Sequence, residues 1–222
     1  MKTIFSNRTE AGVLLAKKLQ PIYLDRADLI VLGLPRGGVP IAYQVAKVLH
    51  APLDICLVRK LGVPGHQELA MGAIASGGIM ILNEDLVRSL KISSKAIEGV
   101  INKEQKELKR REIQYRGDRA APNLRDRSVI LIDDGIATGS TIQAALSSIK
   151  KQRPELIVVA VPVAAPDICK ELKKEVDEVI CLITPEWLYS ISLWYEDFSP
   201  TSDEEVRYFL AKSRQELTAT GC

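Results

Sequence analysis

The stretch "SVILIDDGIATGSTIQAAL", residues 128–146, decides both the fold and the site that the sequence predicts. Its apolar run, 128–133, is typical of a buried strand. Two adjacent carboxylates, Asp133 and Asp134, stand where that strand ends. Buried carboxylates are costly unless something pairs them, so their position indicates a partner or a ligand.

Around this stretch, short β-branched runs alternate with helical patterns. Strands are expected at 29–34, 53–59, 70–76, 79–83, 128–133, 156–162 and 177–183, and helices at 40–50, 94–115, 139–151, 165–174 and from Ser202 onward. The strands 70–76 and 79–83 are expected to turn at Gly77-Gly78. Continuous apolar strands separated by helices predict an α/β fold, a Rossmann-like parallel sheet with helices on both faces.

The composition narrows the class of protein. The 222 residues are 46% hydrophobic and 26% charged with a net charge of +2, so bulk charge does not favour nucleic-acid or membrane partners. The four cysteines are scattered without a CxxC pair, which favours reduced thiols over a zinc site. No run is long enough to span a bilayer, and the first residues lack the apolar core of a signal peptide. We therefore expect a soluble, cytoplasmic protein.

The residues after the two acids have the composition of a phosphate-binding loop. Gly135 and Gly139 permit close backbone approach, and a helix is expected to begin directly afterwards. Backbone amides and hydroxyls at a helix N-terminus bind phosphate well. The residues expected to supply them are Ala137, Thr138, Gly139, Ser140 and Thr141. A phosphate site preceded by carboxylates suits a ribose 5-phosphate; the alternative, a plain helix cap with an acidic turn, is disfavoured by the full pattern.

A second loop, "GLPRGGVP" at 33–40, also follows a predicted strand. It offers the amides of Gly37 and Gly38, expected to be free, beside the cation Arg36. Glycines with one arginine suit a polyanion such as pyrophosphate, and both loops should open on the same edge of the sheet.

A third segment, "VRKLGVPGHQELAMG" at 58–72, places Arg59 and Lys60 before a loop rich in glycine and proline. Such a loop is typical of a mobile surface segment that can close over an anion. An ordinary basic turn is the alternative interpretation.

Together the three segments resemble the type I phosphoribosyltransferase family. "VILIDDGIATGST" is similar to its phosphoribosyl pyrophosphate (PRPP) motif, "LPRGG" to its pyrophosphate loop and "VRKLGVPGHQELAMGAI" to its flexible loop. The resemblance covers roughly residues 28–183, and the chain as a whole resembles uncharacterised bacterial phosphoribosyltransferase-like proteins with the same "WYEDF" tail. It implies one domain over 1–222, with a helical insertion at 84–120 and a hood with a closing helix at 184–222.

The resemblance also implies a mechanism. Mg²⁺ bridges pyrophosphate and ribose oxygens, and Asp133 and Asp134 hold the ribose hydroxyls directly or through metal-bound water. A nitrogenous acceptor attacks the anomeric carbon as pyrophosphate leaves. Arg36, Arg59 and Lys60 are assigned to the leaving group, and the 5-phosphate to residues 137–141. Family members commonly form homodimers, and their pyrophosphate loop often holds a non-proline cis peptide, expected here around Pro35–Gly37.

The acceptor and the activity itself stay open at this point. Ala137 stands where enzymes acting on 6-oxopurines usually carry an acid, which argues against hypoxanthine and guanine. The hood candidates are the N-terminal segment, the long helix and the segment 184–198, whose aromatic side chains either stack on a base or, as we favour, pack inside the protein. These side chains are Trp187, Trp194, Tyr195 and Phe198. A PRPP-sensing regulator and a hydrolase of phosphoribosyl compounds are the alternatives to a transferase.

Overall fold

The computed structural model describes residues 4–219, apart from the side chains of residues 67 and 68. The chain divides into two compact units. The first contains Met1–Ile55, Leu124–Gly139 and Pro154–Cys222, and the second contains Cys56–Asn123 and Ser140–Arg153. Among the described helices, none is long and apolar enough to cross a membrane.

A five-stranded parallel sheet forms the centre of the first unit. Its strand order is β2-β1-β6-β7-β8. The strands are β1 (Leu29–Gly33), β2 (Leu53–Ile55), β6 (Ser128–Ile132), β7 (Leu156–Val163) and β8 (Glu178–Ile183). Every residue of β1 and β6 is buried, as expected for inner strands covered on both faces. The predicted α/β fold is therefore confirmed.

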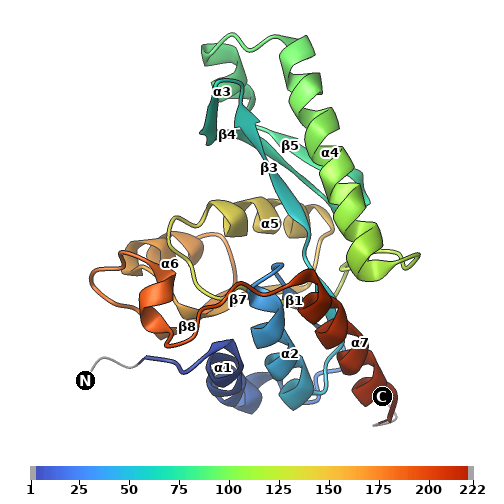
Figure 1. The fold of residues 1–222 in the computed structure, drawn as a ribbon, viewed down its shortest axis with the longest axis vertical. Coiled ribbons are helices and arrows are strands. Elements are labelled where there is room, and N and C mark those ends of the chain that lie inside the picture. The colour runs from blue at the N-terminus through green and yellow to red at the C-terminus, as the bar shows by residue number, and fades with distance from the viewer. Residues whose placement is uncertain (1–3, 220–222) are drawn as a thin grey trace. The chain divides into compact units, whose positions relative to one another are not determined.

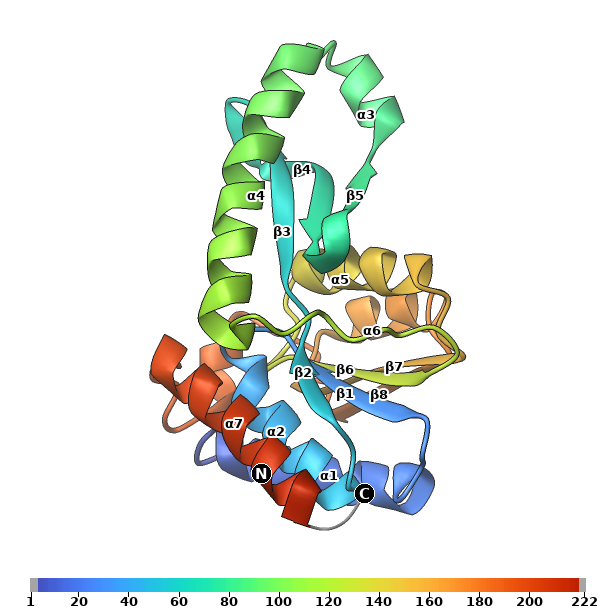
Figure 2. The ribbon, with the colours of Figure 1, turned by 90° about the vertical axis from the view of Figure 1, so that its right-hand side faces the viewer.

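Four helices accompany this sheet. They are α1 (Arg8–Tyr23), α2 (Gly38–Leu49), α6 (Pro166–Leu172) and α7 (Asp203–Ala219), and a short 3₁₀ turn, η2, covers Ile191–Trp194. Figures 1 and 2 show α1, α2 and α7 on one face of the sheet and α6 on the other. The N-terminus of α7 is capped at Ser202, as the sequence predicts. The Ser202 hydroxyl accepts a hydrogen bond from the Glu205 amide (3.1 Å), and the Glu205 carboxylate accepts one from the Ser202 amide (2.7 Å).

The second unit is built on an antiparallel sheet. Its strands, in the order β3-β4-β5, are β3 (Val58–Val63), β4 (His66–Ala75) and β5 (Ile79–Leu82). Its helices are α3 (Glu84–Ser89), α4 (Ser94–Arg116) and α5 (Ser140–Lys151), and η1 covers Ser76–Gly78. The turn between β4 and β5 uses Gly77 and Gly78 at φ 78° and 75°, which only glycine adopts without strain. This hairpin and the long helix α4 were both predicted.

Several features of the fold were not predicted. The segment after Arg59 and Lys60, expected as a mobile loop, forms the antiparallel strands β3 and β4 joined by a short turn, and α3 was not expected as a separate helix. The run 53–59, expected as one strand, divides at residues 56–57 into β2 and β3, which belong to different sheets. The apolar pattern continues through the break, so hydrophobicity could not locate it. Helix α1 was not expected either, although Asn7 caps it by accepting the Glu10 amide at 3.0 Å.

Candidate functional site

The two acids lie directly after β6, at the carboxyl edge of the parallel sheet. Asp133 Oδ1 accepts a hydrogen bond from the Asp134 amide at 2.9 Å. Burial, reinforced by the neighbouring Asp134 charge, raises the pKa of Asp133 well above its usual range. Burial also raises the pKa of Asp134, although Arg8 opposes that shift. Two adjacent carboxyl groups at a sheet edge are therefore kept in a setting that disfavours their charged forms.

Arg8, from the first turn of α1, is the partner that Asp134 requires. Its Nε and Nη2 atoms donate to Asp134 Oδ2 at 3.0 and 2.8 Å, and its Nη1 donates to the Ser199 carbonyl at 2.7 Å. The guanidinium lies 3.9 Å from the centre of the Phe198 ring. The Arg8 and Asp134 side chains are only 12% and 18% exposed, so this ion pair is largely shielded from water. Sequence reasoning missed Arg8, because no local motif connects residues 126 positions apart.

Tyr195 holds the same residue through its backbone. Its hydroxyl donates to the Asp134 carbonyl at 2.7 Å, and its side chain is 5% exposed. The ring lies 5.4 Å from Phe5 and 5.0 Å from Phe198, measured between ring centres. Trp194 is also buried, whereas Trp187 is 71% exposed. Within "WYEDF", Tyr195 therefore holds the Asp134 backbone and Phe198 contacts Arg8, while the packing expected of Trp187 is wrong.

The glycine loop at 35–38 lies against the two acids. A Cβ atom on Gly37 would lie 1.9 Å from Asp134 Oδ2, and one on Gly38 would lie 2.6 Å from the Ile132 carbonyl. Neither position can therefore carry a side chain without displacing the acidic segment. The peptide bond between Pro35 and Arg36 is cis, as predicted. The structure thus brings together two of the three segments that the sequence singled out.

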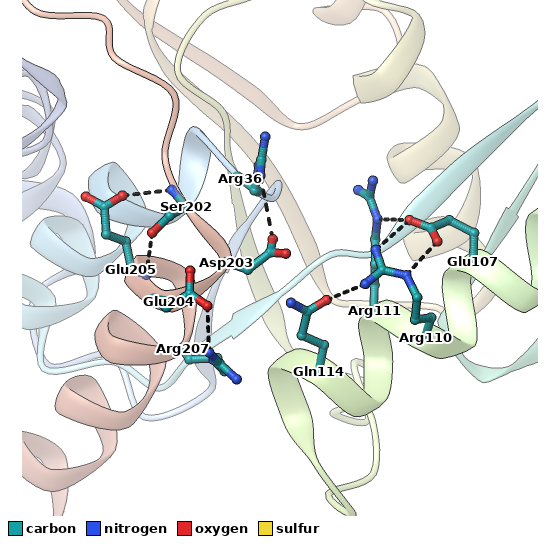
Figure 3. A network of polar contacts seen from close by, with 10 residues as sticks. All are labelled: Arg36, Glu107, Arg110, Arg111, Gln114, Ser202, Asp203, Glu204, Glu205 and Arg207. Carbon is teal, nitrogen blue, oxygen red and sulfur yellow. Dashed lines mark hydrogen bonds and ion pairs between the residues drawn. The ribbon is translucent and has the colours of Figure 1, made fainter.

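In this loop the Gly38 amide differs from the prediction, and Arg36 has a contact that was not predicted. The Gly38 amide is not free, because it donates to the Leu34 carbonyl at 3.0 Å where the chain turns into α2. Arg36 lies on the same loop, and its Nη1 atom is 3.8 Å from Asp203 Oδ1 in the first turn of α7 (Figure 3). The Arg36 side chain is 48% exposed, which leaves its guanidinium accessible to an anion.

The candidate phosphate loop follows Gly135 and leads into α5. The Ile136 amide donates to the Val163 carbonyl at 2.9 Å, which fixes the start of the loop at the end of β7. Gly139 is buried at φ 76°, a conformation that favours glycine. The residues that flank it are exposed: Ala137, Thr138, Ser140 and Thr141. The loop therefore presents small and hydroxylic residues where a helix begins.

Arg59 and Lys60 lie on β3, in the second unit. Arg59 donates to Glu104 Oε2 of α4 at 2.8 Å from Nε, and its Nη2 atom is 2.6 Å from the same oxygen. A pocket of about 340 Å³ lies beside them. Its lining consists of Arg59, Lys60, Gly62, Val63, Pro64, Gly65, Val100, Lys103 and Glu104. Arg59 and Lys60 therefore line a basic pocket within the second unit.

The side chains at the site are of a kind that can bind Mg²⁺ together with a phosphate-containing substrate. Within the described part of the chain, no three His, Cys, Asp or Glu side chains gather as a metal cage. Mg²⁺ does not need one, because it commonly binds one or two carboxylates together with substrate phosphates and water. The adjacent carboxyl groups of Asp133 and Asp134 are oxygen donors of that kind.

An acidic pair and a glycine loop at the carboxyl edge of a parallel sheet are typical of α/β proteins that bind phosphate-containing ligands. Residues 7–197 match the model of the phosphoribosyl transferase domain, and the chain belongs to that family. It is 41% identical over 218 residues to the "putative phosphoribosyl transferase" of Mycobacterium tuberculosis, in both strain CDC 1551 / Oshkosh and strain ATCC 25618 / H37Rv. The match covers 98% of this chain but 49% of those relatives, so the chain spans about half their length.

Two solved structures resemble this chain. The crystal structure of TT1426 from Thermus thermophilus is 39% identical, with a TM-score of 0.84 over 94% of this chain and 98% of that one. The AQ2163 protein from Aquifex aeolicus, at 16% identity and a TM-score of 0.51 over 91% of this chain and 85% of that one, shares the fold.

Proposed function

We propose that this protein is a Mg²⁺-dependent phosphoribosyltransferase that moves ribose 5-phosphate from PRPP to a nitrogenous acceptor and releases pyrophosphate. One observation carries the proposal. The glycine loop at 35–38 touches the acidic pair so closely that a Gly37 side chain would overlap Asp134 Oδ2. A pyrophosphate-binding loop and a ribose-binding acidic pair have to lie together in such an enzyme, because both groups belong to one substrate.

Each residue has a role in this scheme. The carboxyl groups of Asp133 and Asp134 accept hydrogen bonds from the ribose hydroxyls. Arg8 favours their ionised forms against the effect of burial, and bound Mg²⁺ would do the same. In that state their negative charge stabilises the cationic ribose of an oxocarbenium-like transition state. Arg8 keeps one Asp134 oxygen oriented while the other stays available to the ligand. Bound Mg²⁺ would supply positive charge to the pyrophosphate oxygens. The 5-phosphate binds the exposed residues of the loop 137–141.

The leaving group requires cations. Arg36 is half exposed on the glycine loop and is bound only loosely by Asp203, at 3.8 Å. We assign it to the pyrophosphate, together with Arg59 and Lys60 of the basic pocket. Arginine suits this task because its planar fork binds two phosphate oxygens at once.

The acceptor is a nitrogenous compound whose identity the residues leave open, and Ala137 argues against 6-oxopurines. We also propose that the enzyme works in the cytoplasm, without nucleic-acid or membrane partners, and as a homodimer. The net charge of +2 supports the absence of a nucleic-acid partner.

Binding of PRPP with Mg²⁺, measured by titration calorimetry, tests the assigned ligand and the acidic pair. The Asp134→Asn variant keeps the shape of the side chain but loses its charge, so its affinity should fall at least about tenfold. Asp167→Asn is the matched control, because that carboxylate is 91% exposed on α6. Equal affinity in Asp134→Asn and wild type, with an unchanged circular dichroism spectrum, would remove the acidic pair from the site.

A PRPP-sensing regulator is the second candidate, and one observation favours it. Both arginines assigned to the leaving group are paired with acids of the protein, Arg36 with Asp203 and Arg59 with Glu104. A sensor would bind PRPP without releasing pyrophosphate, so turnover separates the two functions.

A further inference from the structure

Two cysteines outside the candidate site lie in direct contact. Cys169 is on α6 and Cys181 is on β8, and their Sγ atoms are 3.1 Å apart. Both are reduced, and a disulfide would require the two sulfur atoms to approach each other by about 1 Å. No motif in the sequence indicated the pair, because the two residues are neither adjacent nor spaced as CxxC.

The surroundings of the pair favour a reactive thiolate at Cys169. A hydrogen bond from the Cys181 thiol, with help from the Lys173 charge, lowers the pKa of Cys169 to about 7. The same hydrogen bond, together with burial, raises the pKa of Cys181. Lys18 of α1 also faces the pair, and its Nζ atom donates to the Cys181 carbonyl at 2.8 Å. At neutral pH a substantial fraction of Cys169 is therefore thiolate, while Cys181 keeps its proton.

Small oxidants can reach this position. β8 is an edge strand of the five-stranded sheet, and Cys181 is partly exposed on it. Cys169 is 8% exposed, so the residue is in contact with solvent and with small reagents dissolved in it. Cys56 has the same exposure, is also reduced and belongs to the second unit, so it serves as an internal comparison.

We propose that Cys169 and Cys181 are a site of reversible oxidation, which a peroxide converts to an intrachain disulfide. The Cys169 thiolate bonds to one peroxide oxygen as the O–O bond breaks, and the departing hydroxide takes up a proton to become water. The Cys181 sulfur then loses its proton and displaces the oxygen from the Cys169 sulfenic acid, which leaves as a second water. The two thiols lose two electrons, and the peroxide gains them.

The disulfide would form beside the candidate phosphate loop. Ile168, next to Cys169 on α6, lies 3.3 Å from the position of a Cβ atom on Gly139. The proposed oxidation of Cys169 and Cys181 does not depend on the proposed enzyme activity, because it is inferred from the contact between the two thiols.

Peptide mapping tests the proposal on the full chain. The reduced protein is treated with a small molar excess of hydrogen peroxide at neutral pH, free thiols are alkylated, and the tryptic peptides are analysed by mass spectrometry. We expect peptide 152–170 linked to peptide 175–207, while peptide 48–59, which contains Cys56, is alkylated. Dithiothreitol should restore both thiols. Sulfinic acid at Cys169 without any linked peptide would overturn the proposal.

Two serine variants test which sulfur reacts first. In Cys181→Ser, Cys169 should be trapped as a sulfenic acid by dimedone, because no second thiol can displace the oxygen. In Cys169→Ser, Cys181 should stay unlabelled. Dimedone on Cys181 in Cys169→Ser, with none on Cys169 in Cys181→Ser, would overturn the assignment.

Discussion

Replacement of Arg8 by alanine should lower the free energy of unfolding. It should also make the charged form of Asp134 less favourable in the folded protein. The change removes two hydrogen bonds to Asp134 Oδ2, one to the Ser199 carbonyl and the contact with the Phe198 ring. Loss of one partner from a fully buried ion pair costs about 3–5 kcal/mol, because the other charge is left uncompensated. Since 12% and 18% of the two side chains remain exposed, we expect about 2–4 kcal/mol at neutral pH.

The loss should depend on pH in a defined direction. Arg8 opposes the rise of the Asp134 pKa, so the pKa of Asp134 in the folded variant is higher than in wild type. Below that pKa Asp134 is protonated and no longer needs a cation. The difference in unfolding free energy between wild type and variant should therefore shrink as the pH falls toward about 4 and grow as it rises toward about 8.

Urea denaturation followed by circular dichroism at several pH values measures this effect. With a slope of about 2 kcal/mol per molar urea, the midpoint should fall by about 1–2 M at neutral pH. Arg207→Ala is the matched control: its pair with Glu204 (3.0 Å) is 49% and 75% exposed, so it should cost no more than about 0.5 kcal/mol. An Arg8→Ala variant as stable as this control at every pH would refute the reasoning.

Three further predictions concern the acids, the basic pocket and the phosphate loop. Asp133→Asn should raise the free energy of unfolding at about pH 8: the pKa of Asp133 is raised on folding, so wild type loses stability as the pH rises above the unfolded value of about 4. Glu104→Gln should lower the stability of the second unit by about 1–2 kcal/mol in urea denaturation, because it removes the charge that pairs Arg59. Gly139→Val should weaken ribose 5-phosphate binding in calorimetry on the order of tenfold, because φ 76° disfavours a β-branched residue and Ile168 leaves it little room.

Two of these predictions have a control variant. Gly77→Val carries a similar positive φ, 78°, but meets no atom within 4 Å, so it should leave phosphate binding unchanged. Glu107→Gln should cost no more than about 0.5 kcal/mol, because Glu107 pairs with Arg110 and Arg111 of its own helix (Figure 3). Asp133→Asn should remove the fall in stability at high pH, and a variant that retains the full wild-type fall would contradict the account of that carboxyl group.

Much of the fold was predictable because its signals are local. The buried runs of β1 and β6, the paired glycines of the β4–β5 turn and the capping box at Ser202 each lie within a few residues of the sequence. The division of 53–59 between two sheets was not predictable, because the apolar pattern does not change where β2 ends. The expected domain boundaries stay a prediction.

The candidate site was predictable to a smaller extent. The acids and the glycine loop belong to motifs, so their residues could be named from the sequence, and the structure brings the two segments into contact. Arg8 and Tyr195 were missed as partners of Asp134, because their contacts depend on how distant segments meet in the fold. The free amide expected at Gly38 was wrong, since the turn into α2 uses that donor. The roles of Arg59, Lys60 and the loop 137–141 stay predictions.

Pyrophosphate release from PRPP with Mg²⁺ tests the central claim most directly. The assay runs with purines, with pyrimidines and with no acceptor, and Asp134→Asn serves as the control. We predict release that depends on one class of acceptor and is lost in the variant. Tight binding of PRPP without release under any of these conditions would contradict a transferase and favour a sensor, and release without an acceptor would indicate a hydrolase.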